Sequence, residues 1–144
     1  MKQSQPVGPE IGLLLRQAHR RAAELATAAL APLGVTGRHF GVLLMLHRDG
    51  PLSQRELMDR LGAEKSSMVR TIDELEDRDL CVRRPSASDR RANAIHLTEA
   101  GRQLFANARG AATTVSETLL ADLAPEERAQ LCDLLARVIA TPSR

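Results

Sequence analysis

Apolar side chains recur along most of this chain with the spacing of α-helices. Between residues 11 and 33 they lie three or four positions apart, which places them on one face of a long helix. Pro32 and Gly34 then disfavour its continuation. The same periodicity predicts further helices over residues 37–48, 99–123 and 125–140. We therefore expect a mainly α-helical protein, organised around a more complex central stretch.

That central stretch, residues 52–101, begins with two short helices joined by a tight turn. Ser53 and Glu56 form the S-x-x-E pattern of a capping box, in which each side chain accepts a hydrogen bond from the other residue's backbone N–H. The first helix should end at Gly62, because glycine readily takes the left-handed conformation found just past a helix end. A second helix is expected to start almost immediately afterwards.

The second short helix has an apolar back and a polar front. Met68, Ile72 and Leu75 share one face and should pack inward. We expect short polar side chains and cations to lie mostly away from that face: Lys65, Ser66, Ser67, Arg70 and Thr71. Short side chains let a helix approach base edges in the major groove of DNA, where arginine pairs with guanine. This helix is therefore a candidate reader of DNA sequence.

A β-hairpin with a cationic tip is predicted next. Residues 81–85 and 93–97 are short segments compatible with strands, and the residues between them are rich in turn formers. Leu52 is expected to pair with this hairpin as a short edge strand. Arg90 and Arg91 at the tip suit a narrow minor groove, where the potential of DNA is most negative.

Several short motifs occur at fixed spacings in residues 61–101. They comprise Leu61, Gly62, Lys65, Ser66, Arg70, Leu75, Glu76 and Leu80, then Asp89 and Arg91 of a D-x-R motif, and Leu97, Thr98 and Gly101 of an LT-x-x-G motif. Together they resemble the winged helix-turn-helix of the MarR family of bacterial transcriptional regulators. Two residues depart from the family pattern. Glu64 replaces a small hydroxyl residue, and Asp79 replaces a glycine, although Asp tolerates left-handed backbone better than most residues.

The resemblance implies a mainly α fold with a small β-hairpin wing, made of a winged helix-turn-helix and a helical dimerisation region. Within one structural domain, residues 1–34 would form an N-terminal arm and dimerisation helix. Residues 35–100 would form the DNA-binding region, and residues 101–144 the C-terminal dimerisation helices. The implied protein is a homodimeric repressor of an inverted-repeat operator in double-stranded DNA, relieved by a small, often aromatic or phenolic anionic ligand.

Specific residues can be assigned to DNA contacts on this basis. Ser66, Ser67 and Arg70, with Thr71 beside them, are expected near base edges and adjacent phosphates. Arg90 and Arg91 should enter the minor groove, with Asp89 holding an arginine in place. We assign the positioning contacts with phosphates to Ser53, Gln54, Lys65 and Arg84.

A ligand pocket between the dimer helices and the winged region is also implied by the resemblance. Its expected lining from the first two long helices is Arg16, His19, Arg20, His39, Phe40, Leu43 and His47. The cationic members of this set would pair with a carboxylate or phenolate.

Composition and short motifs limit which classes of function and location the sequence allows. The net charge is only +2, but four arginines and a single aspartate fall between residues 83 and 91. Motifs for a nucleophilic serine, a phosphate-binding loop, H-E-x-x-H or C-x-x-C are absent, so we expect neither catalysis nor a cofactor. No apolar run approaches the length of a membrane span and no signal peptide is evident, so we expect a cytoplasmic protein.

Three alternatives stay open at the level of sequence. His19, together with His39 or His47, would provide ligands for a metal-responsive repressor, although no bound metal is expected. Cys81 or Cys132 would make a thiol-responsive repressor, although we expect both thiols to be buried. Outside regulation of transcription, the winged region would bind protein instead of DNA. The cations at Arg70, Arg90 and Arg91 argue against that last alternative.

Overall fold

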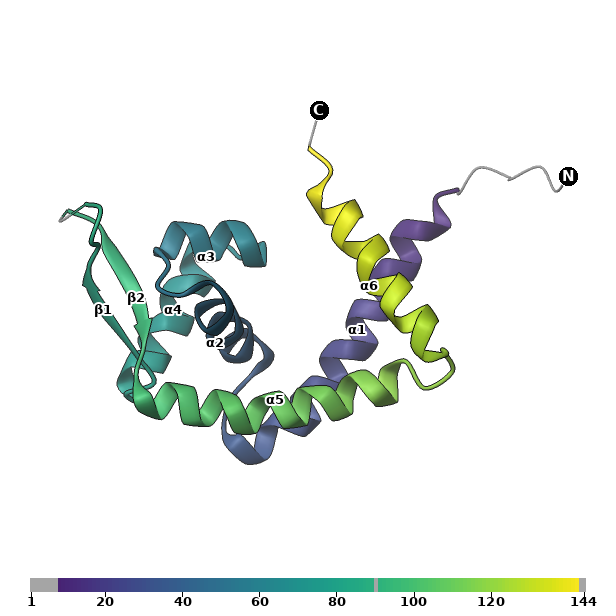
Figure 1. The fold of residues 1–144 in the computed structure, drawn as a ribbon, viewed down its shortest axis with the longest axis horizontal. Helices are drawn as coiled ribbons and strands as arrows, with labels where there is room; N and C mark the ends of the chain where they lie inside the picture. Colours follow the sequence, from purple (N-terminus) through teal and green to yellow (C-terminus); the bar gives the residue numbers. More distant parts are fainter. Residues whose placement is uncertain (1–7, 90, 143–144) are drawn as a thin grey trace, which may run out of the picture.

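The computed structural model describes residues 8–89 and 91–142 and has a mainly helical architecture with one two-stranded antiparallel hairpin (Figure 1). The elements in chain order are α1 (Glu10–Leu30), the 3₁₀ turn η1 (Ala31–Leu33), α2 (Gly37–Asp49), α3 (Gln54–Leu61), α4 (Lys65–Asp77), β1 (Cys81–Pro85), β2 (Asn93–Leu97), α5 (Glu99–Leu119) and α6 (Pro125–Ala140). The predicted fold class is thereby confirmed. Arg90, which we assigned to the minor groove, lies outside the described residues.

Several helix ends lie where local sequence chemistry predicts them. The capping box of α3 is formed, with Ser53 Oγ accepting from the Glu56 N–H at 3.1 Å and Glu56 Oε1 accepting from the Ser53 N–H at 3.2 Å. Gly62 follows α3 with a φ of 63°, the left-handed conformation expected there. Thr36 caps α2, and its partner in that box is His39. Short-range hydrogen bonds thus define the boundaries of the helix-turn-helix.

A second set of local contacts joins α4, the hairpin and α5. Asp79 has a φ of 56°, which is the backbone conformation anticipated at this replaced glycine. The Thr98 hydroxyl donates to the Asp79 carbonyl and accepts from the Gly101 N–H, so it caps α5 and holds the turn after α4. Gly101 lies directly against the Leu80 carbonyl, where an added Cβ would clash with backbone. This close approach accounts for the glycine of the LT-x-x-G motif.

The main core lies within the winged helix-turn-helix. Val42, Leu43, Leu57 and Ile72 have no exposed surface, and Phe105 of α5 is 2% exposed. Leu52 closes this core by pairing with Ile95, as predicted, through backbone hydrogen bonds of 2.7 and 3.3 Å. A smaller cluster of Leu30, Val35 and Ala108 lies at the junction of α1, α2 and α5.

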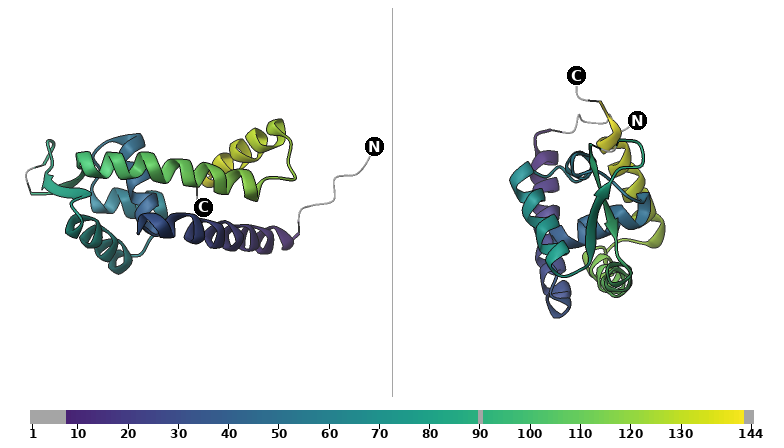
Figure 2. Two further views of the ribbon diagram at one scale, coloured as in Figure 1. Left: turned by 90° about the horizontal axis from the view of Figure 1, so that it is seen from below. Right: turned by 90° about the vertical axis from the view of Figure 1, so that its left-hand side faces the viewer.

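Helix α5 connects the two ends of the molecule. It runs from the hairpin base toward α6 (Figure 1; Figure 2), and α1 packs against it. The predicted end of this helix at residue 123 is wrong, because α5 ends at Leu119. The carbonyls of Leu120 and Leu123 instead accept hydrogen bonds from Arg128 Nε at 3.1 and 3.0 Å, and these bonds stabilise a turn into α6.

Helices α1 and α6 expose apolar surface at the end of the molecule away from the hairpin (Figure 1). Leu14 of α1 is 58% exposed and Ile139 of α6 is 82% exposed. None of the described side chains of α6 is buried, and only Leu30 of α1 is. In the part of the chain that the structure describes, no single helix is long and apolar enough to span a membrane. Residues 10–33 and 37–49 meet that criterion only as a pair, bent by 83°.

Candidate nucleic-acid interface

The exposed face of α4 carries most of the side chains expected to read bases. Lys65, Ser66 and Arg70 are exposed, and Ser67 is half-buried. The prediction that Thr71 lies on this polar face is wrong, because Thr71 is only 5% exposed and its hydroxyl donates to the Ser67 carbonyl at 2.8 Å. It lies at the border of the apolar face, and packing turns it inward. Thr71 therefore does not belong to the polar face of α4.

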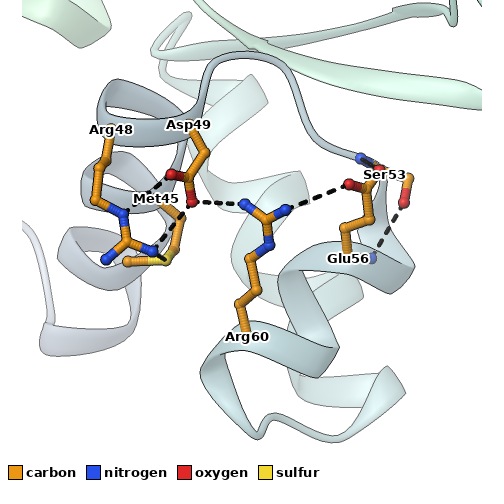
Figure 3. Close-up of polar contacts among 6 residues, drawn as sticks. All are labelled: Met45, Arg48, Asp49, Ser53, Glu56 and Arg60. Atoms are coloured by element: carbon orange, nitrogen blue, oxygen red, sulfur yellow. Dashed lines mark hydrogen bonds and ion pairs between the residues drawn. The ribbon is translucent and has the colours of Figure 1, made fainter. Parts of the chain in front are cut away.

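The N-terminus of α3 is held by an ionic network that starts in α2 (Figure 3). Arg60 contacts the Asp49 carboxylate at 2.5 Å and the Glu56 carboxylate at 3.7 Å. Glu56 in turn caps Ser53, so the network fixes the first turn of α3. Ser53 and Gln54, the predicted phosphate contacts, are both half-buried there. The Ser53 hydroxyl accepts a capping bond, and its own proton stays free to donate to a phosphate.

Charge within this network is strongly paired. Arg48 Nε donates to Asp49 Oδ1 at 3.1 Å, and a second donor of Arg48 reaches Oδ2 at 3.1 Å. The hydrogen bond from Arg48, supported by Arg60, lowers the pKa of the Asp49 carboxyl from its ordinary value. The same contact raises the pKa of Arg48. Arg48 and Arg60 are thus both paired with protein carboxylates in this structure, at exposed positions.

The hairpin presents cations at the side of the helix-turn-helix. Arg84 and Arg91 are exposed, and so is Asp89. Asp89 Oδ1 accepts from the Arg91 backbone N–H at 2.9 Å. It therefore shapes the turn of the hairpin tip by holding the backbone of Arg91, whereas we had expected it to hold an arginine side chain.

Arg83, its neighbour on β1, has a different environment that the sequence analysis missed. Its guanidinium bridges two carboxylates of α4, with Nη2 at 2.8 Å from Asp73 and Nη1 at 2.7 Å from Glu76. Side chains alternate along a strand, so Arg83 shares a face with the buried Cys81, whereas Arg84 points away. That alternation, with acidic residues three positions apart on α4, was a usable signal. Arg83 thus cannot be counted with the free cations of the hairpin.

Two further polar contacts tie α4 to the connection between α1 and α2. His39 Nε2 lies 2.6 Å from Glu74, and its Nδ1 accepts from the Thr36 N–H at 3.0 Å. Arg78 donates to the carbonyls of Gly34 and Leu33 at 2.6 and 3.3 Å. These contacts join the C-terminal half of α4 to the start of α2 and to the turn that follows α1.

A cavity of about 790 Å³ lies beside α4, between α1, α2 and α5. Its walls are mainly apolar, with several alanines from α1 and α5. His19 and Phe40, two of the predicted ligand contacts, line it. So do Arg38 from α2 and Ser67 from α4, neither of which we had assigned to ligand. Because α4 forms one wall, an occupant would touch the candidate DNA-reading helix directly.

The other predicted ligand contacts lie elsewhere. Arg16 lies on the exposed surface of α1, and Arg20 forms an exposed ion pair with Glu24. His39 is engaged with Glu74, and Leu43 is fully buried in the core. His47 stacks near Phe105, with ring centroids 4.5 Å apart, and borders a separate cavity of about 240 Å³. The resemblance suggested which helices line the pocket, but it did not distinguish the residues that face the cavity from those that face the core or the solvent.

The thiols and histidines do not favour the sensor alternatives. Burial raises the pKa of the Cys81 thiol to about 12, and the nearby Glu76 adds to the shift. Cys132 is exposed on α6, so our expectation that it would be buried is wrong for the single chain. Among residues 8–89 and 91–142, no group of three or more potential metal-binding side chains comes together.

Comparison with known proteins gives a consistent picture. A sequence model of the MarR family matches residues 33–92. The chain is similar to a MarR-family transcriptional regulator from Rhodococcus sp. RHA1, with 28% identity, 95% of this chain and 97% of that one covered, and a TM-score of 0.86. It is equally similar in sequence to CouR from Rhodococcus jostii RHA1 bound to p-coumaroyl-CoA, at 28% identity over 98% of this chain and 99% of that one, with a TM-score of 0.83.

A third structure supports the fold alone. A cysteine-to-serine variant of MarR from E. coli, complexed with operator DNA, is 24% identical, covers 90% of this chain and 94% of its own, and has a TM-score of 0.79. Each of the three structures covers at least 90% of this chain, which is more than the residues 33–92 that the family model matches.

Proposed function

Because this chain belongs to the MarR family of transcriptional regulators, we propose that it is a homodimeric repressor that binds an inverted-repeat operator and is released by a small anionic ligand. The observation that carries the DNA-binding part is the arrangement of cations on α4 and the hairpin. Lys65 and Arg70 are exposed on a helix whose apolar face is buried, and Arg84 and Arg91 lie on the adjoining wing. A helix in the major groove and a cationic wing in the minor groove would use both surfaces together.

The dimer is proposed from the unpartnered apolar surface of α1 and α6. Exposed leucine, isoleucine and valine side chains on both helices would be buried by a second copy of the same surface, as a two-fold interface requires. Two recognition helices related by a two-fold axis would then contact half-sites one helical turn apart. E. coli MarR, whose fold this chain shares, has been determined in complex with operator DNA, so the fold is compatible with DNA binding.

The ligand response is proposed from the position of the cavity. Its apolar walls suit an aromatic group. Two basic residues on its lining, His19 and Arg38, suit an anionic group at a distance from the Glu64 carboxylate, which also borders the cavity. The neighbouring CouR structure contains p-coumaroyl-CoA, which combines an aromatic acyl group with phosphates. A ligand that fits only when α1 and α4 separate would bind the DNA-free form more tightly and so lower DNA affinity.

The first experiment is a fluorescence-anisotropy titration with DNA from upstream of the protein's own gene, across a salt series. We expect nanomolar binding that weakens steeply with salt, because each neutralised phosphate releases counterions. Arg70→Ala should weaken binding about 5- to 150-fold and relax base preference, and Arg91→Ala should also lower affinity. Arg109→Ala on the exposed face of α5 is the matched control and should leave binding unchanged.

Equal and weak binding to that DNA and to random DNA would call for selection from a random-site library. Failure of that selection would contradict the DNA-binding assignment and favour a protein partner. The ligand part is tested by adding p-coumarate or p-coumaroyl-CoA as probes. Ala112→Phe, which would fill part of the cavity, should keep DNA affinity and lose the response to either probe that acts on the unmodified protein.

A further inference from the structure

The contact between Arg83 and α4 joins the two parts of the proposed DNA reader. Arg83 lies on β1, the first strand of the wing, whereas Asp73 and Glu76 lie one helical turn apart on α4. Both ion pairs are short, at 2.8 and 2.7 Å, and the Arg83 side chain is only 27% exposed. A guanidinium that spans two carboxylates is held in a defined orientation, unlike the single point charge of a lysine.

The wing needs such an attachment because a two-stranded hairpin is marginally stable alone. On the β2 side, the backbone of Ile95 pairs with Leu52. Arg83 lies opposite Ile95 in the β-ladder, so its side chain projects on the same face as the 1%-exposed Ile95 side chain. Within the described part of the chain, the ion pairs of Arg83 are the side-chain salt bridges that connect the wing to α4.

We propose that Arg83 is a positioning residue that fixes the angle of the wing relative to the recognition helix. This inference rests on the proposed function and deepens it. With the angle fixed, the distance between the major-groove contact of Arg70 and the minor-groove contact of Arg91 is set before DNA is encountered. The protein would therefore read both grooves as one rigid surface, with a defined offset between the two contacts in each half-site.

Two simpler roles for Arg83 make different predictions. If Arg83 bound a phosphate itself, its removal would lower affinity independently of Arg91. If it only stabilised the fold, its removal would lower the thermal midpoint without changing how the wing contributes to binding. The carboxylates help to separate these cases, since deleting negative charge near DNA should by itself strengthen binding.

The first test uses the protein without DNA. Backbone ¹⁵N relaxation of the Ser88 and Arg91 amides reports the order of the hairpin tip. Arg83→Gln should lower the order parameters of these amides, and Arg84→Gln, its exposed neighbour, should leave them unchanged. The double variant Asp73→Asn/Glu76→Gln breaks the same contacts from the helix side and should reproduce the effect of Arg83→Gln. Unchanged order parameters in both ion-pair variants would overturn the proposal.

The second test is a double-mutant cycle on an operator obtained by random-site selection. In the parent protein we expect Arg91→Ala to weaken binding about tenfold, and in the Arg83→Gln background by less than about twofold, because a loose wing no longer places that side chain. Arg84→Gln combined with Arg91→Ala should give independent effects. Asp73→Asn/Glu76→Gln should weaken binding despite the loss of negative charge, and Arg83→Lys should recover part of the coupling.

Each outcome of the cycle decides between the roles. Independent effects of Arg83→Gln and Arg91→Ala, with tighter binding by the double carboxylate variant, would overturn the positioning role. If the parent protein selects no DNA site, the proposed function fails, whereas the relaxation experiment still decides whether Arg83 orders the wing.

Discussion

The two ends of this molecule use apolar residues in opposite ways. At the winged end, Leu57, Ile72 and Ile95 are buried within one chain, and polar contacts between elements surround that core. At the end formed by α1 and α6, residues of the same kinds are exposed, as Leu14 and Ile139 illustrate. The first region buries its apolar side chains within one chain, whereas the second leaves them without a covering surface in the part of the chain that the structure describes. The difference indicates that the apolar residues of the winged end stabilise the fold of the single chain, whereas those of α1 and α6 are left for contact with a partner.

The two regions meet at the cavity and at the connection between α1 and α2. The cavity lies between the two regions, lined by α1 and α5 on one side and by α4 on the other. Arg78 and the His39–Glu74 pair join α4 to the connection between α1 and α2. We expect substitutions in the winged core to act mainly on stability, and substitutions on the exposed apolar surface of α1 and α6 to act mainly on assembly.

The largest effect is expected from charge placed on the assembly surface. Val138→Asp/Ile139→Asp would put two carboxylates where a second copy should pack, and burying them there would cost desolvation energy. We expect light scattering to show a monomer and operator affinity to fall at least about 100-fold, because the second half-site is lost. Arg137→Ala, on the same helix, is the control. A parent protein that is already monomeric at micromolar concentration would contradict the proposed dimer.

A substitution in the winged core should lower folding stability, whereas the substitution on α6 should prevent assembly. Ile72→Ala removes a fully buried side chain from α4 and should lower the free energy of unfolding by about 2–5 kcal/mol. Chemical denaturation followed by circular dichroism measures the loss. The same loss should be found when the chain concentration changes tenfold, provided that the dimer persists. A loss that vanishes at high concentration would show that the core and the assembly surface are coupled.

Cys81 provides a pH-dependent test of how well the core of the winged end is buried. Its pKa is raised from 9.0 to about 12, mainly by burial, so the folded state keeps a proton that the unfolded state loses. The contribution is fully present below pH 9.0. Above it, the free energy of unfolding should fall by about 1.4 kcal/mol per pH unit, until the folded thiol itself titrates. Denaturation of Cys81→Ala between pH 8 and 10.5 should lack this slope, and an equal slope in both proteins would contradict a buried thiol.

The smallest effect is expected at the exposed network between α2 and α3. Contacts with Arg48 and Arg60 lower the pKa of Asp49 from 3.8, so its contribution to stability is present above that value and is lost as the pH falls below it. Asp49→Asn should therefore lower the thermal midpoint slightly at pH 7, and the difference should disappear in acid. Asp59→Asn, which removes an exposed carboxylate of α3 that makes none of the ion pairs seen among the described residues, is the control for the loss of charge alone. A difference that persists at low pH would indicate a role unrelated to charge.

The DNA-reading surface was only partly predictable from sequence. Motif spacing led directly to Ser66, Arg70 and Arg91, which lie on the exposed helix and wing. Thr71 was misplaced because it lies at the edge of an apolar face, where a small rotation of the helix decides between burial and exposure. Arg83 contributed to the charge count of residues 83–91, although its partners lie seven and ten residues away on a helix. Charge counting along a chain does not show which charges are already paired.

The lining of the cavity was harder to predict than the exposed face of α4. Of the predicted ligand contacts, His19 and Phe40 line the cavity, whereas Leu43 and His39 share their helix with cavity residues but face the core or α4. Periodicity separates an inward from an outward side, and it does not divide the inward side between packed core and open space. Arg38 had no motif to mark it, and only the relative position of α1, α2 and α5 places it on the cavity wall.

By itself, the sequence determined what depends on neighbouring residues. The capping boxes, the left-handed Gly62 and Asp79, the two strands and the start of α6 all follow from hydrogen bonds and backbone preferences within a few positions. Tertiary structure alone decided the pairing of Arg83 with α4, the burial of Thr71, the exposure of Cys132 and the shape of the cavity. Those features depend on the angles and distances at which whole helices pack, and such geometry is set by the sum of many contacts across the chain.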